Sequence, residues 1–229
     1  MLKPVPSLLA ALAAALVTVS TAAAITGGAV DGDAHPYVGA LVVDGSVQCS
    51  GVLVAPTVFA TAGHCGVDGS RVAVSLDAKL GDGWTLLQGT LEVDETKGAD
   101  LAVVVLDAPA GVVPASLPAV GSADSLGKGA LVTSVGYGYS SRAADGSFVY
   151  DGLRHAGSSP VKRVARATIV ISTSTTGPCM GDSGGPQLSG STVLSLTSTG
   201  SRDCSGTAEG YRLDTQSARA FLGGFVSLP

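Results

Sequence analysis

The sequence predicts an all-β protein, an antiparallel sandwich or barrel with one short helix near its C-terminus. Short apolar or alternating stretches recur along the chain, and glycine- and serine-rich turns separate them. Repeated short strands between turn signals are typical of sandwiches and barrels. Glycine is abundant, at 32 of 229 residues, which favours turns over long helices. Hydrophobic residues make up 45% of the chain and charged residues 14%, so the composition suits a packed core and excludes disorder.

The first 24 residues predict a signal peptide. Lys3 is a positive start, Leu8 to Val19 form an apolar stretch, and Ala22-Ala23-Ala24 is a small-residue pattern typical of a cleavage site. The stretch is shorter than the roughly 20 residues of a membrane helix, and no later apolar run is as long. We therefore expect a secreted, extracellular protein that does not enter a membrane and whose mature chain covers residues 25–229.

Seven strands and one helix are predicted in the mature chain. The helix has Asp214 as its N-cap and runs to Leu222, where Gly223-Gly224 stops it. Between the strands, residues 108–129 combine several prolines with weak periodicity, so this stretch is expected to link two halves. The predicted strands are 39–43, 52–55, 71–76, 101–106, 131–136, 161–171 and 193–197.

Four cysteines predict two disulfides, because export brings the chain into an oxidising compartment. They are Cys49, Cys65, Cys179 and Cys204. Three pairings are possible, and we prefer the local one, Cys49 with Cys65 and Cys179 with Cys204, because it closes short loops. Zinc ligands usually lie two to four residues apart in the sequence. No two cysteines here are that close, so we expect no metal and no other cofactor.

The charge of the chain argues against a nucleic-acid partner. Lys and Arg number 13 against 18 Asp and Glu, a formal net charge of -5. Nucleic-acid binders usually present a basic face that replaces counterions along the phosphate backbone.

The strongest chemical signal surrounds Ser183, in the stretch Gly181-Asp182-Ser183-Gly184-Gly185-Pro186. Glycines on both sides of the serine allow a tight turn that points backbone N–H groups into a small cavity, where they could stabilise an oxyanion. The letters also fit the G-x-S-x-G elbow of an α/β-hydrolase. That fold places its histidine after the serine, whereas all three histidines of this chain precede Ser183.

A serine nucleophile needs a base, and His64 in Thr61-Ala62-Gly63-His64-Cys65 is the candidate. A buried carboxylate should orient this histidine. Asp100 fits because it opens the apolar run 101–106, whereas Asp94 lies in an acidic stretch and Asp107 ends its strand. The alternatives are purely structural roles: Ser183 as a turn residue, His64 as a core histidine and Asp100 as a cap at the end of a strand.

These residues resemble the trypsin-like (chymotrypsin-family) serine proteases, in which the order His, Asp, Ser is the rule. The segments that carry the resemblance are Ile25-Thr26-Gly27-Gly28, TAGHC, ADLAVVVL, GDSGGP and Ser198-Thr199-Gly200. The resemblance implies two antiparallel six-stranded β-barrels with a cleft between them, about residues 25–118 and 119–229, and the local disulfide pairing. It makes His64 the general base, Asp100 its orienting partner and Ser183 the nucleophile. The N–H groups of Gly181 and Ser183 would form the oxyanion hole, and Ser198 to Gly200 would pair with the substrate backbone.

The resemblance also gives Asp182 a task. In the family the freed N-terminal amine pairs with the carboxylate beside the serine, which here would join Ile25 to Asp182. Because the predicted signal peptidase site directly precedes Ile25, we expect export itself to yield the active form. The alternative is a dipeptide propeptide that another protease trims.

The predicted substrate pocket favours apolar or aromatic side chains. The position that carries an aspartate in tryptic enzymes, six residues before the nucleophile, is Gly177. Gly200 and Gly210 resemble the pocket-wall glycines, and Ser198 lies beside them. If the match of this segment to the family is shifted by one residue, Glu209 would instead enter the pocket and restore a preference for basic residues.

The sequence thus predicts a secreted, monomeric serine endopeptidase with chymotrypsin-like specificity. Its expected partners are polypeptide substrates and protein protease inhibitors. Two other classes stay open, a non-catalytic homologue that binds through the same cleft and an esterase. His35 and His155 match no motif and are expected at the surface or in packing. Tyr137 and Tyr139 are expected to pack the barrel rather than to form a binding platform.

Overall fold

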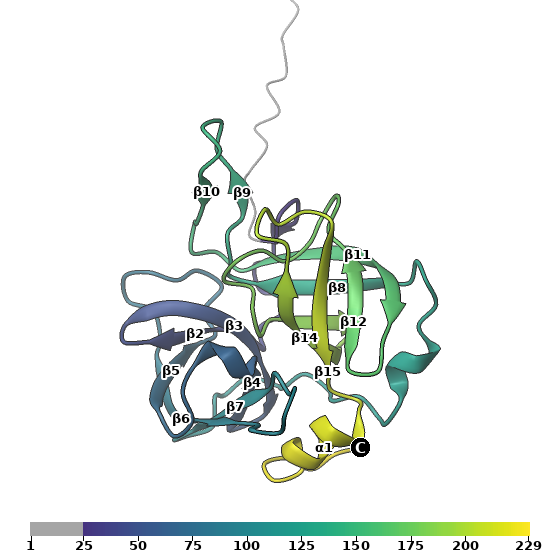
Figure 1. The fold of residues 1–229 in the computed structure, drawn as a ribbon. Helices are drawn as coiled ribbons and strands as arrows, with labels where there is room; N and C mark the ends of the chain where they lie inside the picture. Colours follow the sequence, from purple (N-terminus) through teal and green to yellow (C-terminus); the bar gives the residue numbers. More distant parts are fainter. Residues whose placement is uncertain (1–24) are drawn as a thin grey trace, which may run out of the picture.

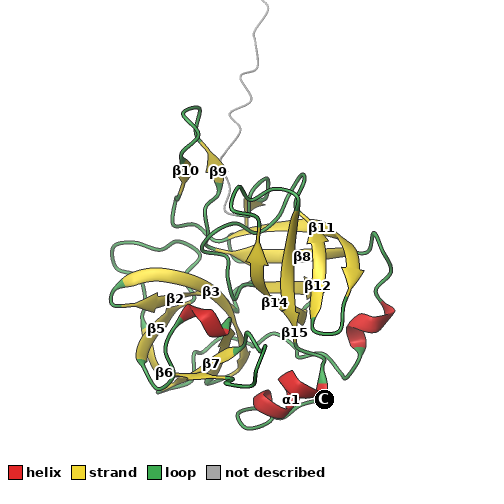
Figure 2. Cartoon of the chain, viewed as in Figure 1, coloured by secondary structure: helices red, strands yellow, loops and turns green. Residues whose placement is uncertain are grey.

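A computed structural model describes residues 25–229, and the predicted signal peptide at residues 1–24 lies outside the described part. The described chain forms two closed six-stranded antiparallel barrels and one C-terminal α-helix (Figure 1 and Figure 2). The predicted all-β class and the two barrels implied by the resemblance are therefore confirmed. No helix within residues 25–229 is long and apolar enough to cross a membrane.

The first barrel closes in the order β2-β3-β4-β7-β6-β5. Alternate residues of its strands face inward and form a core that includes Leu41, Leu53, Phe59, Leu91 and Val104. The three β-branched valines of Ala102-Val103-Val104-Val105-Leu106 favour an extended backbone, and both faces of this strand are largely buried. The strands are β2 (Val38–Val43), β3 (Ser46–Ala55), β4 (Val58–Thr61), β5 (Arg71–Ser75), β6 (Leu87–Val93) and β7 (Ala102–Leu106).

The second barrel follows the order β11-β12-β15-β14-β13-β8, and pairing of β8 with β11 closes it. Two short additions extend it: β1 (Ala29–Val30) pairs with β11, and the hairpin of β9 (Ser141–Arg142) and β10 (Phe148–Val149) projects from its rim (Figure 1). The barrel strands are β8 (Leu131–Gly136), β11 (His155–Val164), β12 (Thr168–Ser172), β13 (Pro186–Ser189), β14 (Thr192–Gly200) and β15 (Thr207–Arg212).

The predicted strand 161–171 is wrong in its extent, because the structure divides this stretch between β11 and β12. The two strands pair with each other across a turn in which Ala165 N donates to Thr168 O. The turn residues Ala165-Arg166-Ala167 include no glycine or proline, so the sequence carries no visible break. The strands predicted at 39–43, 71–76, 101–106 and 131–136 match β2, β5, β7 and β8 within one residue.

An apolar layer joins the barrels and the helix. Val38 and Val52 contribute from the first barrel, Val135 and Leu188 from the second, and Leu222 from the helix. The connection between β7 and β8 holds the short 3-10 helix η2 (Ser122–Ser125). The predicted boundary between the two barrels, at residues 118 and 119, lies in the same connection, before η2.

Arg154 joins the barrels by polar contacts. Its guanidinium is fully buried and donates to the carbonyl oxygens of Val38 and Leu76 in the first barrel half, and to the carboxylate of Asp31. Tyr137 is also buried, as predicted, and its hydroxyl donates to Val38 O. These contacts fix how the two barrels face each other.

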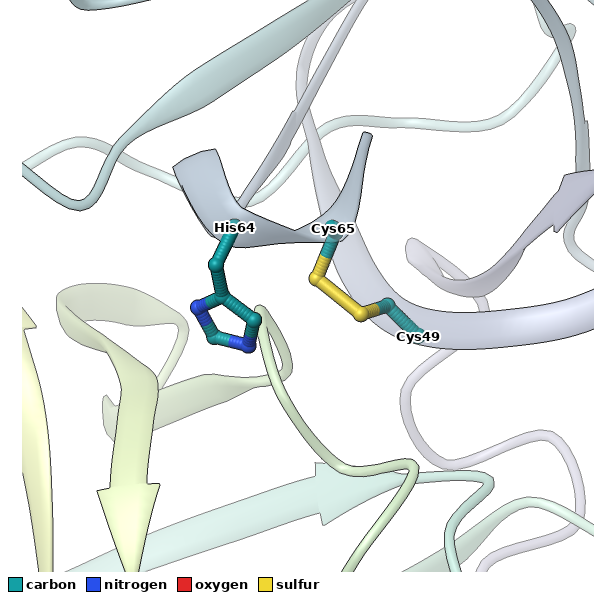
Figure 3. Close-up of side chains that lie close together, drawn as sticks. All are labelled: Cys49, His64 and Cys65. Carbon is teal, nitrogen blue, oxygen red and sulfur yellow. A yellow bond between two sulfur atoms is a disulfide. The ribbon is translucent and has the colours of Figure 1, made fainter. Parts of the chain in front are cut away.

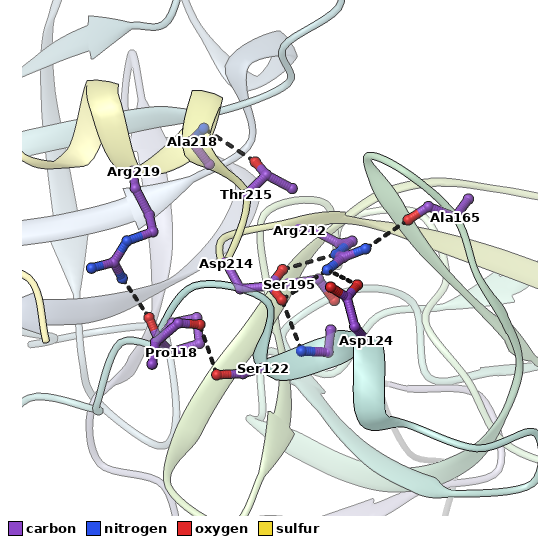
Figure 4. A network of polar contacts seen from close by, with 12 residues as sticks. Pro118, Ser122, Asp124, Ala165, Ser195, Arg212, Asp214, Thr215, Ala218 and Arg219 are labelled. Carbon is purple, nitrogen blue, oxygen red and sulfur yellow. Dashed lines mark hydrogen bonds and ion pairs between the residues drawn. The ribbon is translucent and has the colours of Figure 1, made fainter.

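The helix α1 (Gln216–Leu222) begins one residue later than predicted. Thr215, not Asp214, is its N-cap, and its hydroxyl accepts from the N–H of Ala218. The carboxylate of Asp214 is instead bound by the guanidinium of Arg212, at 2.8 Å for both oxygens, and by the N–H of Ala123 (Figure 4). A paired cation two residues away holds this carboxylate more strongly than a helix terminus does.

Candidate active site

His64 lies on a rigid support. It belongs to the 3-10 helix η1 (Gly63–Cys65), which directly follows β4. Cys65 forms a disulfide with Cys49 of β3, and Figure 3 shows His64 and this disulfide side by side below the same short helix. A Cβ at position 63 would lie 3.1 Å from Leu101 N, so η1 packs against the segment that carries Asp100.

Asp100 binds His64 through both the main chain and the side chain. Its Oδ1 accepts from the backbone N–H of His64 at 3.0 Å and lies 3.0 Å from Nδ1 of the ring. Ser198 Oγ donates to the other carboxylate oxygen at 2.5 Å. Because a carboxylate only accepts hydrogen bonds, Nδ1 carries the proton and Nε2 is left as a free acceptor.

The pair shifts both pKa values in the direction that keeps it charged. The hydrogen bond to Asp100 raises the pKa of His64 above its ordinary value, against the opposing effect of burial. Burial raises the pKa of Asp100, but the hydrogen bonds from His64 and Ser198 outweigh this and hold it below its ordinary value. The site therefore stabilises an imidazolium at position 64.

Ser183 lies in a tight turn whose backbone conformation favours glycine at positions 181 and 184. Gly181 and Gly184 have φ values of 91° and 77°, a region that disfavours other residues. A Cβ on Gly184 would lie 2.2 Å from the Thr61 hydroxyl, so the turn presses against the segment before His64. Within the described chain, neither the N–H of Gly181 nor that of Ser183 donates a hydrogen bond.

A chain of contacts brings Ser183 to the His64 side of the cleft. Ser50 N, in the first barrel, donates to Ser183 O at 2.8 Å. Ser183 and Ser198 line one cavity, and Ser198 binds the same carboxylate as His64. No hydrogen bond between residues 25–229 joins Ser183 Oγ to His64; the contacts place the serine turn against the segments that carry His64 and Asp100.

Asp182 is completely buried beside the turn. Its carboxylate accepts from the backbone N–H groups of Gly138, at 2.8 Å, Cys179, at 2.9 Å, and Ile25. Burial raises the pKa of Asp182 to about 7, although these hydrogen bonds oppose the rise. A Cβ on Gly138 would lie 2.6 Å from the carboxyl carbon, so glycine makes room for the group.

The second disulfide joins Cys179 to Cys204, so both bridges follow the preferred local pairing. The first bridge also determines whether a group of three potential metal ligands could bind a metal. Cys49, His64 and Cys65 place one potential metal-ligand atom each within 4.8 Å of one another. Both sulfurs are bound in the disulfide and are not thiolates, so the group offers a metal only the imidazole.

The cavity beside Ser183 has a volume of about 200 Å³ and includes two predicted pocket residues, Ser198 and Gly200. Ala208 also lines it; this residue is paired with Gly200 between β14 and β15, 3.6 Å from where a Cβ on Gly200 would lie. Arg202 is the one charged side chain from residues 25–229 at its wall. Neither Ala208 nor Arg202 is predicted as a pocket residue from the sequence.

The other predicted pocket residues lie outside this cavity. Gly177 forms a β-bridge with Thr26. The α-carbon of Gly210 faces the interior of the second barrel, where a Cβ would lie 2.5 Å from Gln187 Oε1. Glu209 points outward and lies 3.6 Å from Arg163, so its carboxylate does not enter the cavity.

Two closed barrels with a histidine, an aspartate and a glycine-flanked serine at their junction define the chymotrypsin fold. The sequence profile of the Trypsin family matches residues 24–221, and the chain belongs to this family. No curated protein matches the chain.

Solved structures share the fold at low sequence identity. HL collagenase is 18% identical with a TM-score of 0.72, and the match covers 92% of this chain and 100% of that one. The structure of HBP is also 18% identical, with a TM-score of 0.71, covering 90% and 98%. A mutant of human heparin binding protein (CAP37) is 17% identical with a TM-score of 0.69, covering 88% and 96%.

Proposed function

We propose that this chain is a secreted serine endopeptidase that uses Ser183, His64 and Asp100. The observation that carries the proposal is the double attachment of His64 to Asp100, which leaves Nε2 free to accept a proton. The unpaired N–H groups of Gly181 and Ser183 supply the second requirement, donors for a developing oxyanion.

The reaction proceeds through an acyl-enzyme. His64 Nε2 takes the proton of Ser183 as its Oγ attacks the scissile carbonyl carbon, and the oxyanion is stabilised by the N–H groups of Gly181 and Ser183. The imidazolium then gives its proton to the leaving amine, and the peptide bond breaks. Water then gives a proton to His64 as its oxygen attacks the ester carbonyl carbon. The imidazolium returns this proton to Ser183 Oγ as the ester bond breaks, which releases the acyl half as an acid and restores the serine.

Residues 198–200 bind the substrate backbone in this proposal. β14 pairs with β13 only as far as Leu196, and on its other side it pairs with β15 up to Gly200. Within the described chain, residues 198–200 therefore have one unpaired edge, which suits an extended peptide added as a further strand.

Uncharged or apolar side chains are the proposed choice for the residue before the cleaved bond. No carboxylate from residues 25–229 lines the cavity beside Ser183, so a lysine or arginine would find no ion partner there. Chromogenic substrates that differ only at this position test the choice. Phe and Tyr substrates should be cleaved faster than Lys and Arg substrates, and the reverse order would contradict it.

The proposed active form begins at Ile25. The backbone nitrogen of Ile25 already donates to Asp182, and cleavage after Ala24 would turn this amide into an ammonium that pairs with the carboxylate. The two disulfides are consistent with secretion. N-terminal sequencing of secreted material should give Ile25; a start at Ala23 with full activity would contradict direct activation.

Fluorophosphonate labelling tests the catalytic assignment. The probe should modify the unsubstituted protein and not Ser183→Ala, whereas Ser201→Ala, at an exposed serine of the same cavity, should still be labelled. A folded protein that resists the probe would be a binding homologue. Casein hydrolysis separates a peptidase from an esterase, because an esterase would cleave small esters alone.

A further inference from the structure

The buried side chain of Ser50 reaches from the first barrel to the turn that carries Ser183. Ser50 belongs to β3, directly after the disulfide-bonded Cys49, and is fully buried. Its hydroxyl donates to Gly181 O at 3.0 Å and accepts from Tyr137 N at 2.9 Å. A carbonyl oxygen only accepts and a backbone N–H only donates. These two partners therefore fix the direction in which the hydroxyl points its proton.

The main chain of Ser50 connects the same turn to the support of His64. Ser50 N donates to Ser183 O at 2.8 Å, and Ser50 O accepts from the hydroxyl of Thr61, also at 2.8 Å. Thr61 is the last residue of β4, and the chain passes from it into η1, which carries His64. Ser50 is therefore bound both to the turn of the proposed nucleophile and to the strand that leads to the proposed base.

The carbonyl oxygens of residues 180–183 each accept a hydrogen bond within residues 25–229. Ser50 supplies two of these four bonds from the first barrel, and the other two come from the second barrel half. The four bonds are Tyr139 N to Met180 O, Ser50 Oγ to Gly181 O, Gly185 N to Asp182 O and Ser50 N to Ser183 O.

Tyr139 makes its bond to this turn with its main chain alone. Its ring is expected to pack the barrel, but it is half-buried and lies 5.5 Å from the ring of Phe148 in β10. The reason is that the chain leaves the barrel after β8 to form the β9–β10 hairpin. Ser50 is therefore the residue that binds the turn with a side chain.

The bond from the Ser50 hydroxyl holds the peptide group between residues 181 and 182. This peptide lies between the two N–H groups proposed as oxyanion donors, those of Gly181 and Ser183. Because a peptide group is planar, holding its oxygen helps to fix how the two donors are oriented. Its N–H, on Asp182, donates to Cys179 O at 3.1 Å within the second barrel half, so Ser50 supplies the contact to the first barrel. Gly181, with a φ of 91°, has wide conformational freedom, and the turn depends on such contacts.

We propose that the hydroxyl of Ser50 positions the oxyanion hole relative to His64. It ties Gly181 to the barrel that carries the base, so that the two donor N–H groups and the imidazole keep one arrangement while charge develops. Ser50 is a positioning residue, because it is buried beneath the turn and reaches neither the substrate nor the reacting atoms. Donors that are already in place stabilise the transition state, so the effect belongs in kcat rather than in KM. The inference rests on the proposed peptidase function.

Ser50→Ala tests this inference. The kcat for a chromogenic peptide, counted per active site titrated with a fluorophosphonate, should fall about tenfold, less than the roughly 10²–10³ that loss of an oxyanion donor costs. KM should stay within about twofold. A peptide trifluoromethyl ketone adds to the serine and forms a charged oxygen in the hole, so it should bind about tenfold more weakly. The acid midpoint of kcat/KM should not move, because the hydroxyl does not contact His64.

Ser159→Ala is the matched control. Ser159 is fully buried in β11, and its hydroxyl donates to Thr176 O at 2.6 Å, so this variant also loses a buried bond from a hydroxyl to a main-chain carbonyl. Its melting temperature should fall, but its kcat should not. If Ser50→Ala does not fold, Ser50→Gly carries the same prediction, because it also lacks the hydroxyl.

Four results would overturn the inference: undiminished kcat in the Ser50 variant, a loss confined to KM, a shifted acid midpoint, or an equal loss of kcat in Ser159→Ala. Absence of turnover in the unsubstituted protein would instead overturn the proposed function.

Discussion

The carboxylate of Asp100 determines which nitrogen of His64 carries a proton. It accepts from both the backbone N–H and Nδ1 of this residue, and the Ser198 hydroxyl holds it from the opposite side. The ring therefore has little freedom to turn or to exchange tautomers. In the proposed reaction, this arrangement keeps Nε2 ready to accept the proton of Ser183.

Asp100→Asn should lower kcat by about four orders of magnitude. The amide would donate to Nδ1 and move the ring proton to Nε2, which could then no longer accept from Ser183. Steady-state hydrolysis of a chromogenic peptide measures the loss. Asp107→Asn is the matched control, because Asp107 is an exposed carboxylate at the end of β7 that pairs with Arg71. An Asp100→Asn variant with undiminished kcat would exclude the proposed role.

The pH dependence of kcat/KM should follow His64. Its pKa is raised by the hydrogen bond to Asp100, and only the neutral ring can accept a proton. Activity should therefore fall as the pH decreases through this pKa, with the acid midpoint above the ordinary histidine value of roughly 6.5. A midpoint below that value would show that the pair does not stabilise the imidazolium.

Sequence patterns predict His64, Asp100 and Ser183 because each lies in a distinctive local context. The pocket walls are harder to predict. The pairing of β14 with β15 shifts between Thr197 and Thr199 and sets Gly200 opposite Ala208. Gly210, which resembles a pocket-wall glycine in the sequence, faces the barrel interior instead. An irregularity of pairing leaves no mark in the sequence, so it cannot be read from the chain.

Among the elements, the C-terminal helix depends on two neighbouring residues with different tasks. Thr215 caps α1, whereas Asp214 pairs with Arg212 and accepts from the N–H of Ala123 in η2, within the connection between the barrels. The sequence predicts the helix and its end correctly but assigns the N-cap to Asp214 instead of Thr215. Both residues are good caps, and the partner cation becomes visible only in the structure.

Asp214→Ala should destabilise the protein more than Thr215→Ala. Loss of the carboxylate leaves the guanidinium of Arg212 buried with only Asp124 as an ion partner, at a cost of about 3 kcal/mol. Loss of the cap costs about 1 kcal/mol. Urea unfolding measures both free energies, with Gln216→Ala, at an exposed helix residue, as the near-neutral control. An equal effect of the two substitutions would contradict this division of tasks.

For the whole molecule, the described N-terminal segment links the turn that carries Ser183 to the edge of the second barrel. Ile25 is buried, and its nitrogen meets the carboxylate of Asp182, while β1 pairs with β11. The spacing of turns and strands predicts the all-β class, and the ordered motifs imply two barrels. Neither the turn spacing nor the motifs predict the contacts that hold the barrels together, such as those of Arg154, because these contacts join residues far apart in sequence.

A chain extended before Ile25 should lose stability as the pH rises, relative to a chain that begins at Ile25. In the extended chain the nitrogen is an uncharged amide, and burial raises the pKa of Asp182 to about 7. A raised carboxyl pKa favours the fold below the unfolded pKa of roughly 4, and this advantage is lost as the pH rises through about 7. A free ammonium at Ile25 removes the loss by pairing with the carboxylate.

Thermal melting of the two forms between about pH 5 and pH 8 measures the difference. The extended form, which retains Ala23 and Ala24, should show the steeper decline in melting temperature. All other titrating groups are the same in both forms, apart from the terminal amine, so the comparison isolates the Ile25 and Asp182 pair. Parallel declines would contradict it.

The placement of the two covalent bridges has a consequence for protein engineering. Cys49–Cys65 lies within the first barrel half and Cys179–Cys204 within the second, so no cystine staples one half to the other in the described chain. His64 and Asp100 belong to one half, and Ser183 to its neighbour. Two separately produced fragments, divided in the linker between β7 and β8, would each lack part of the proposed triad. If the proposed triad is correct, turnover would therefore require the two fragments to associate.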